Sequence, residues 1–83
     1  MVENSQSEII VYGTSWCGDC MRARRLLDRT AIKYKWIDID QDSEGEKYVK
    51  SVNKGNRSVP TIVFPDGSIL VEPLDSALMK KLS

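Results

Sequence analysis

The chain has 83 residues, 41% hydrophobic and 29% charged, which is the composition of one small globular domain. Its 12 basic and 12 acidic residues cancel at neutral pH, so the strongly basic surface of nucleic-acid-binding proteins is excluded. The absence of histidine excludes imidazole catalysis, and the two cysteines are too few for the disulfide framework of small secreted domains.

The chain shows no membrane or secretion signal. Residues 1–8 are polar and acidic, without the basic start and apolar core of a signal peptide. The longest apolar run, residues 9–12, is far too short to cross a bilayer. We therefore expect a cytoplasmic, monomeric protein without membrane or nucleic-acid partners, in which residues 1–7 form a flexible tail and residues 8–83 one domain.

The first half of the chain alternates strand and helix patterns. Residues 9–12 are β-branched and aromatic and are predicted to form a buried strand. From Cys17 onward apolar residues recur every three to four positions, which predicts a helix with Ser15 as a candidate cap. Residues 34–39 predict a second strand, and residues 42–53 predict a second helix.

The second half predicts a hairpin and a final helix. Residues 61–64 and 68–71 flank a Pro-Asp-Gly turn and are expected to pair as antiparallel strands. Residues 74–82 predict a short helix. The order βαβαββα indicates a parallel βαβ unit joined to a hairpin, and hence an α/β fold with a four-stranded mixed sheet and three helices.

The two cysteines, Cys17 and Cys20, lie at the predicted junction of the first strand and helix. A zinc site needs about four ligands, so a metal would require a second chain or external thiols. A structural disulfide would close a very small loop and remove little unfolded-state entropy. A redox couple fits the position better, because the first sulfur faces the free N–H groups of a helix start, which favour the reactive thiolate.

Three stretches give the chain a resemblance to the glutaredoxin family, and within it to the mycoredoxin branch. They are T-S-W-C-G-x-C over residues 14–20, S-V-N-x-G-N-R-x-V-P-T over residues 51–61, and D-G-S over residues 66–68. The resemblance implies the glutaredoxin type of thioredoxin-like fold. It also implies a cis bond between Val59 and Pro60 beside Cys17, where the Val59 backbone would pair with the substrate.

The predicted site has catalytic and substrate-binding members. The resemblance implies that Cys17 attacks a disulfide and that Cys20 or a small thiol then resolves the mixed disulfide. Trp16 is expected to be exposed substrate surface, and Arg57 is expected either to hold the polar end of the thiol or to be a solvated loop residue. The full set of candidate substrate-binding residues is Trp16, Arg57, Val59, Pro60, Thr61, Gly67 and Ser68; no metal ligands are expected.

Two departures from the family pattern concern the thiol. Thr14 stands where glutathione-using glutaredoxins carry a lysine, and residues 70–75 lack the G-G-x-D-like stretch that binds the γ-glutamyl end. We therefore expect reduction of mixed disulfides between proteins and a low-molecular-weight thiol, with a mycothiol-like thiol ahead of glutathione. That thiol would be the reductant, and no bound cofactor is expected.

Two alternative functions remain open at this point. The chain could be a redoxin recharged by a flavin-dependent thioredoxin reductase, donating electrons to ribonucleotide reductase or peroxidases. A protein of another class would bridge an iron–sulfur cluster between two chains, although C-G-D-C lacks the C-G-F-S pattern of the main cluster-carrying glutaredoxins.

Asp19 is the candidate residue for tuning the redox couple. Its carboxylate suits the first turn of a helix, but the same charge near Cys17 should disfavour the thiolate. We therefore expect Asp19 to make the pair a stronger reductant. Arg22, Arg25 and Arg29 share one face of the same predicted helix. This face is interpreted either as solvated surface or as a docking surface for a partner.

Overall fold

The computed structural model describes residues 8–83, so the predicted tail over residues 1–7 lies outside the described part of the chain. Within that part the elements are β1 Ile9–Gly13, α1 Gly18–Arg29, β2 Tyr34–Asp38, α2 Ser43–Val52, β3 Thr61–Val63, β4 Ile69–Val71 and α3 Asp75–Leu82. The predicted order βαβαββα is confirmed, and the predicted bounds are wrong only by single residues at element ends.

The four strands form one mixed sheet in the order β2-β1-β3-β4. β1 and β2 run parallel, and Gly13 at the end of β1 lies opposite Asp38 at the end of β2. β3 is antiparallel to both of its neighbours, and its first residue, Thr61, lies opposite Tyr12 of β1. The carboxyl ends of β1 and β2 and the start of β3 therefore meet at one edge of the sheet.

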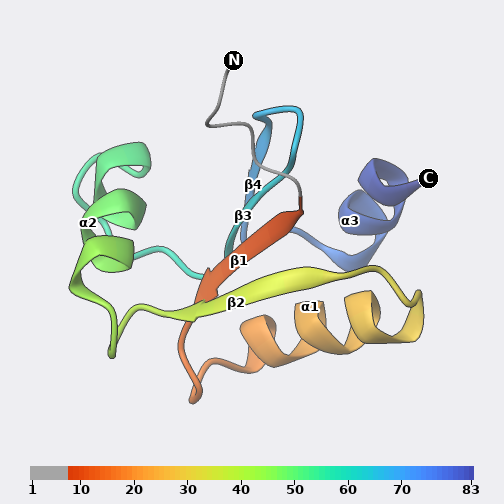
Figure 1. Cartoon of the computed structure of the whole chain (residues 1–83), viewed down its shortest axis with the longest axis horizontal. Helices are drawn as coiled ribbons and strands as arrows, with labels where there is room; N and C mark the ends of the chain where they lie inside the picture. Colours follow the sequence, from red (N-terminus) through yellow and green to blue (C-terminus); the bar gives the residue numbers. More distant parts are fainter. Residues whose placement is uncertain (1–7) are drawn as a thin grey trace.

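The side chains of β1 alternate between the two faces of the sheet. One face forms the main core with α1 and α3. The core residues are Ile9, Val11, Ala23, Leu26, Leu27, Ile62, Phe64 and Leu78. On the other face Tyr12 stacks on Tyr48 of α2, with ring centroids 5.0 Å apart. Figure 1 shows α2 set apart from α1 and α3, and the last two contact each other. No helix within residues 8–83 is long and apolar enough to span a membrane.

Candidate active site

Cys17 occupies the cap position of α1. Its sulfur accepts a hydrogen bond from the Cys20 N–H at 3.1 Å, and its own N–H donates to the Thr14 carbonyl at 3.3 Å. The prediction of Ser15 as the cap was wrong, because the chain first makes a turn and the Cys17 side chain supplies the acceptor. The half-buried sulfur therefore lies where the positive end of the helix dipole favours a negative charge.

Cys20 lies one helical turn further along and is completely buried. Burial, together with the hydrogen bond to Cys17, raises the pKa of Cys20 from 9.0 to about 12. At neutral pH this residue is therefore a thiol. The two sulfur atoms are not bonded to each other, so the structure shows the reduced form of the pair.

Gly13 lies close to both the Cys20 sulfur and the Trp36 ring. A Cβ placed on Gly13 would lie 2.6 Å from the Cys20 Sγ and 2.8 Å from the Trp36 ring, closer than side chains approach one another. The backbone of Gly13 has no unusual φ, so glycine is needed here for space. The local sequence pattern indicates only the end of a strand at Gly13, so this requirement was not predicted.

The loop before β3 lies against Cys17. The Val59–Pro60 peptide bond is cis, and the Val59 carbonyl is 3.9 Å from the Cys17 Sγ, so the expected cis bond beside Cys17 is confirmed. Thr61 is fully buried, and its hydroxyl donates to the Ser58 carbonyl at 2.7 Å and accepts from the Asn53 side chain at 3.2 Å. The Thr61 side chain therefore holds the loop, and its part in substrate binding stays a prediction.

A chain of polar contacts links Trp16 to Arg57. The Trp16 ring is 70% exposed, as expected, and its Nε1–H donates to the Asp40 Oδ2 at 2.8 Å. The other Asp40 oxygen accepts from the Arg57 Nη2 at 2.5 Å, while the Arg57 Nε lies 2.7 Å from a Glu46 oxygen. Arg57 is thus neither a simple solvated loop residue nor an unpaired cation. We call Trp16, Asp40, Arg57 and Glu46 the rim network.

Asp40 is a site residue that sequence analysis missed. It lies just beyond β2, after Ile39, and β2 runs parallel to β1, which leads to Cys17. Residues after the carboxyl ends of neighbouring parallel strands meet at the same sheet edge. That rule, applied to the predicted βαβ unit, could have placed Asp40 beside Trp16.

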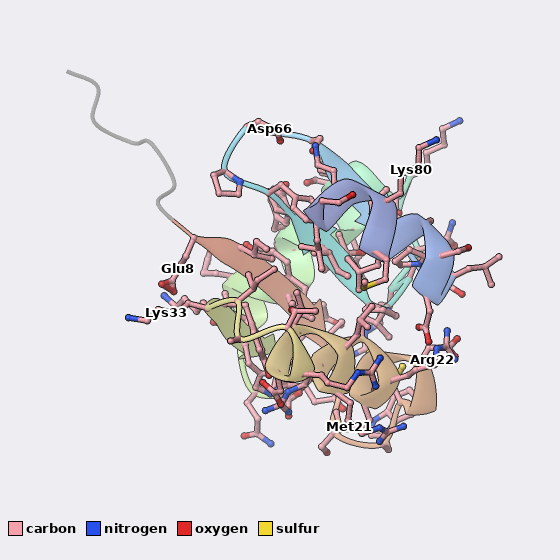
Figure 2. All side chains as sticks on the ribbon, turned by 90° about the vertical axis from the view of Figure 1, so that its right-hand side faces the viewer. Glu8, Met21, Arg22, Lys33, Asp66 and Lys80 are labelled. Atoms are coloured by element: carbon pink, nitrogen blue, oxygen red, sulfur yellow. The ribbon has the colours of Figure 1, made fainter. Side chains whose placement is uncertain are left out.

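Asp19 is exposed on the first turn of α1 and is paired with Arg22. The Arg22 Nη1 lies 2.7 Å from an Asp19 oxygen, and its Nε lies 3.1 Å from an Asp75 oxygen at the start of α3. Figure 2 shows Arg22 on the side of α1 that faces α3. The negative charge of Asp19 is therefore partly compensated by Arg22, which Asp75 also contacts, a three-residue cluster that was not predicted because Asp75 is distant in the chain.

The structure does not bring Gly67 and Ser68 to the cysteines, and their role in substrate binding stays a prediction. They lie in the turn between β3 and β4, and β3 is antiparallel to β1, so this turn is near the start of β1. The Ser68 hydroxyl and N–H both donate to Asp66, at 2.7 and 2.9 Å.

The described surface also has a hollow that is far from the cysteines. Its volume is about 510 Å³, and it is lined by Glu8, Ile9, Ile32, Lys33, Phe64, Pro65, Asp66, Lys81 and Leu82. Glu8, Lys33 and Asp66 mark its surroundings in Figure 2. Within residues 8–83 no group of three or more cysteine, aspartate and glutamate side chains is arranged to hold a metal ion.

Comparison with known proteins shows which family and which relatives the chain is similar to. The sequence model of the family described as glutaredoxin matches residues 9–69. Mycoredoxin 1 of Corynebacterium glutamicum is 41% identical over 76 residues, covering 92% of this chain and 94% of that protein. A protein of Mycobacterium tuberculosis with a glutaredoxin name is 42% identical over 74 residues, covering 89% of this chain and 88% of that protein.

A solved structure supports the fold independently. A crystal structure of a thioredoxin-like protein matches with a TM-score of 0.80 and 22% identity, covering 92% of this chain and 100% of that one. At this identity the likeness shows the fold alone. The predicted thioredoxin-like fold is confirmed.

Proposed function

The chain belongs to the glutaredoxin family, and from this premise we propose that it reduces mixed disulfides between proteins and a low-molecular-weight thiol. It is a thiol–disulfide oxidoreductase of the glutaredoxin and mycoredoxin type with a C-x-x-C pair, Cys17 and Cys20. The members of this family use a low-molecular-weight thiol. The roles of the individual residues and the identity of the thiol are our proposal.

The difference between the two cysteines carries the proposal. Cys17 is half-buried at the start of α1 and accepts an N–H hydrogen bond, whereas Cys20 is buried with a pKa raised to about 12. The Cys17 thiolate attacks one sulfur of the substrate disulfide. A bond forms between the Cys17 sulfur and that sulfur, the substrate disulfide breaks, and the other partner leaves as a thiolate.

Resolution of the mixed disulfide then follows one of two routes. In the dithiol route Cys20 loses its proton, attacks the Cys17 sulfur and releases the second partner, leaving a Cys17–Cys20 disulfide. In the monothiol route an external thiolate attacks the mixed disulfide and restores the Cys17 thiolate. The raised pKa of Cys20 favours the monothiol route at neutral pH. An external thiol with an ordinary pKa lies closer to the ambient pH and therefore supplies more of the attacking thiolate than Cys20 does.

A thiol without carboxylates fits the site better than glutathione. Thr14, at the family's lysine position, is only 1% exposed and offers no cation. The cation of Arg57 is already paired with Asp40 and Glu46. Mycothiol is a cysteine joined to a sugar and carries no free carboxylate, whereas glutathione carries two. These contacts support a mycothiol-like thiol as the preferred partner.

The test uses a peptide cysteine linked to mycothiol or to glutathione, with release of the small thiol as the readout. Cys17→Ser should abolish release from both peptides, and Cys20→Ser should retain release while losing reduction of dithiol disulfides in proteins. An active Cys17→Ser with an inactive Cys20→Ser would contradict the assigned roles. Rapid reduction by a flavin-dependent thioredoxin reductase and NADPH, without response to small thiols, would favour the alternative redoxin function.

A further inference from the structure

The rim network places two carboxylates against one guanidinium. Asp40 and Glu46 both contact Arg57, and Glu46 also lies 3.9 Å from the Lys50 Nζ. The side chains of Asp40 and Arg57 are 35% and 38% exposed, so a ligand bound beside Cys17 can reach them. A carboxylate of a ligand would have to compete with Asp40 and Glu46 for the guanidinium.

Asp40 is held in place from two sides. One of its oxygens accepts from Arg57 and the other from the indole N–H of Trp16, the residue directly before Cys17. These two hydrogen bonds keep the pKa of Asp40 below its ordinary value of 3.8, Arg57 contributing more than Trp16. The carboxylate is therefore ionised throughout the physiological range, and its pairing with Arg57 persists.

Asp40 also connects three separate segments at this edge of the sheet. It lies in the loop between β2 and α2, Trp16 lies in the loop between β1 and α1, and Arg57 lies in the loop before β3. The last two loops are those that carry Cys17 and the Val59 carbonyl beside it. The charge of Asp40 is thus fixed next to the place where a mixed disulfide must bind.

We propose that Asp40 is a specificity-determining residue that disfavours thiols carrying carboxylates: by occupying Arg57 it denies a thiol's carboxylate the cation that would bind it. This inference rests on the proposed function, and it concerns the thiol half of the mixed disulfide. Removal of the Asp40 charge frees part of the Arg57 guanidinium and gives the rim a carboxylate-binding group.

The experiment compares two substrates of nearly equal size on one model peptide, its mixed disulfides with glutathione and with glutathione diethyl ester. The wild-type protein should have the higher kcat/KM for the ester. Asp40→Asn preserves an acceptor for Trp16. It should raise the kcat/KM for the glutathione substrate relative to that for the ester substrate by about twofold to fivefold, the effect expected of one partly exposed charge pair. The change should appear mainly in KM.

Two further variants separate the proposal from a general charge effect. Arg57→Gln added to Asp40→Asn should abolish the gain. Glu44→Gln removes the same charge from the first turn of α2, where Glu44 pairs with Lys47 at 3.7 Å, and should leave the ratio unchanged. An unchanged ratio in Asp40→Asn, or an equal shift in Glu44→Gln, would overturn the proposal.

A second measurement does not depend on the proposed function. In a Cys20→Ser background, the rates at which Cys17 reacts with neutral iodoacetamide and anionic iodoacetate report the charge at the site. Asp40→Asn should speed iodoacetate relative to iodoacetamide only when Arg57 is present. If neither peptide is turned over by the wild-type protein, the proposed function fails. The ratio of the iodoacetate rate to the iodoacetamide rate still supports or overturns the role of Asp40.

Discussion

At the scale of single residues, environment separates two chemically identical side chains. Cys17 receives an N–H hydrogen bond at the start of a helix, and Cys20 is fully buried one turn further on, with Gly13 close to its sulfur. The first environment favours the charged sulfur and the second favours the neutral thiol. The order of the pair along the chain predicted which cysteine would be exposed, because only the first precedes the helix.

Asp19 and Arg22 should shift the reduction potential in opposite directions. Asp19→Asn removes a negative charge near Cys17, favours the thiolate and should raise the potential. The pairing with Arg22 at 2.7 Å limits the effect to about 10 mV, at the low end of what one solvent-screened charge gives. Arg22→Gln leaves Asp19 and Asp75 uncompensated and should lower the potential. Equilibration with a thiol buffer measures both, and shifts of the same sign would contradict the argument.

Cys20 should make the reduced protein less stable at alkaline pH. Its pKa is 9.0 in an ordinary environment and about 12 here, so above pH 9.0 the unfolded chain loses a proton that the folded chain keeps. Stability should therefore fall between these values, by at most about 1.4 kcal/mol per pH unit. Urea unfolding from about pH 8 to 10.5 should show a steeper loss than in Cys20→Ser. Parallel profiles for the two proteins would refute the prediction.

At the scale of elements, local sequence patterns predicted every helix and strand of the described chain. Period, turn residues and β-branched runs are local signals, and each element of this fold has one. The element ends were less predictable because they depend on caps. α1 is capped by the Cys17 sulfur, and α2 by Asp42, whose carboxylate accepts from the Gly45 N–H at 3.0 Å. A cysteine is not a usual cap, so residue preferences pointed to Ser15.

The junction of β1 and α1 should tolerate no side chain at position 13. Gly13→Ala places a methyl group against Cys20 and Trp36 and should cost about 1–3 kcal/mol, the range for overpacking. Gly18→Ala is the control: nothing lies within 4 Å of its added Cβ, so it should be neutral or stabilising by up to about 0.5 kcal/mol. Urea unfolding of the reduced proteins measures both. Equal stability of the two variants would show that the contact around Cys20 yields easily.

At the scale of the whole molecule, two opposite edges of the sheet carry different features: the candidate active site lies at one and a structural ion pair at the other. The edge at the ends of β1 and β2 carries Cys17, Asp40 and the Val59–Pro60 bond. Sequence motifs predicted the cysteines and the proline, which lie in family signatures. They missed Asp40 and Asp75, because each acts through a partner distant in the chain, and they did not show that Gly67 and Ser68 lie at the other edge. Such contacts follow from topology, which local patterns do not contain.

At the opposite edge of the sheet, the Asp66 side chain links the β3–β4 turn to α3. Its Oδ2 lies 2.7 Å from the Lys81 Nζ, and its Oδ1 accepts from Ser68. Lys81 first, and then Ser68, hold the pKa of this carboxyl well below its ordinary value of 3.8. A lowered pKa in the folded state stabilises the protein above that ordinary value, and the stabilisation is lost as the pH falls below it.

Asp66→Asn should therefore reduce stability at about pH 7, and the difference from wild type should shrink as the pH is lowered below about 3.8. Glu44→Gln, which alters an exposed pair 3.7 Å long, should show little difference at either pH. Urea midpoints at several pH values measure this effect. Because the turn lies at the edge away from Cys17, kcat/KM for a mixed disulfide at neutral pH should not change. A stability difference that persists undiminished in acid would mean that the ion pair with Lys81 is not its source, and a fall in kcat/KM would mean that the two edges are coupled through the sheet.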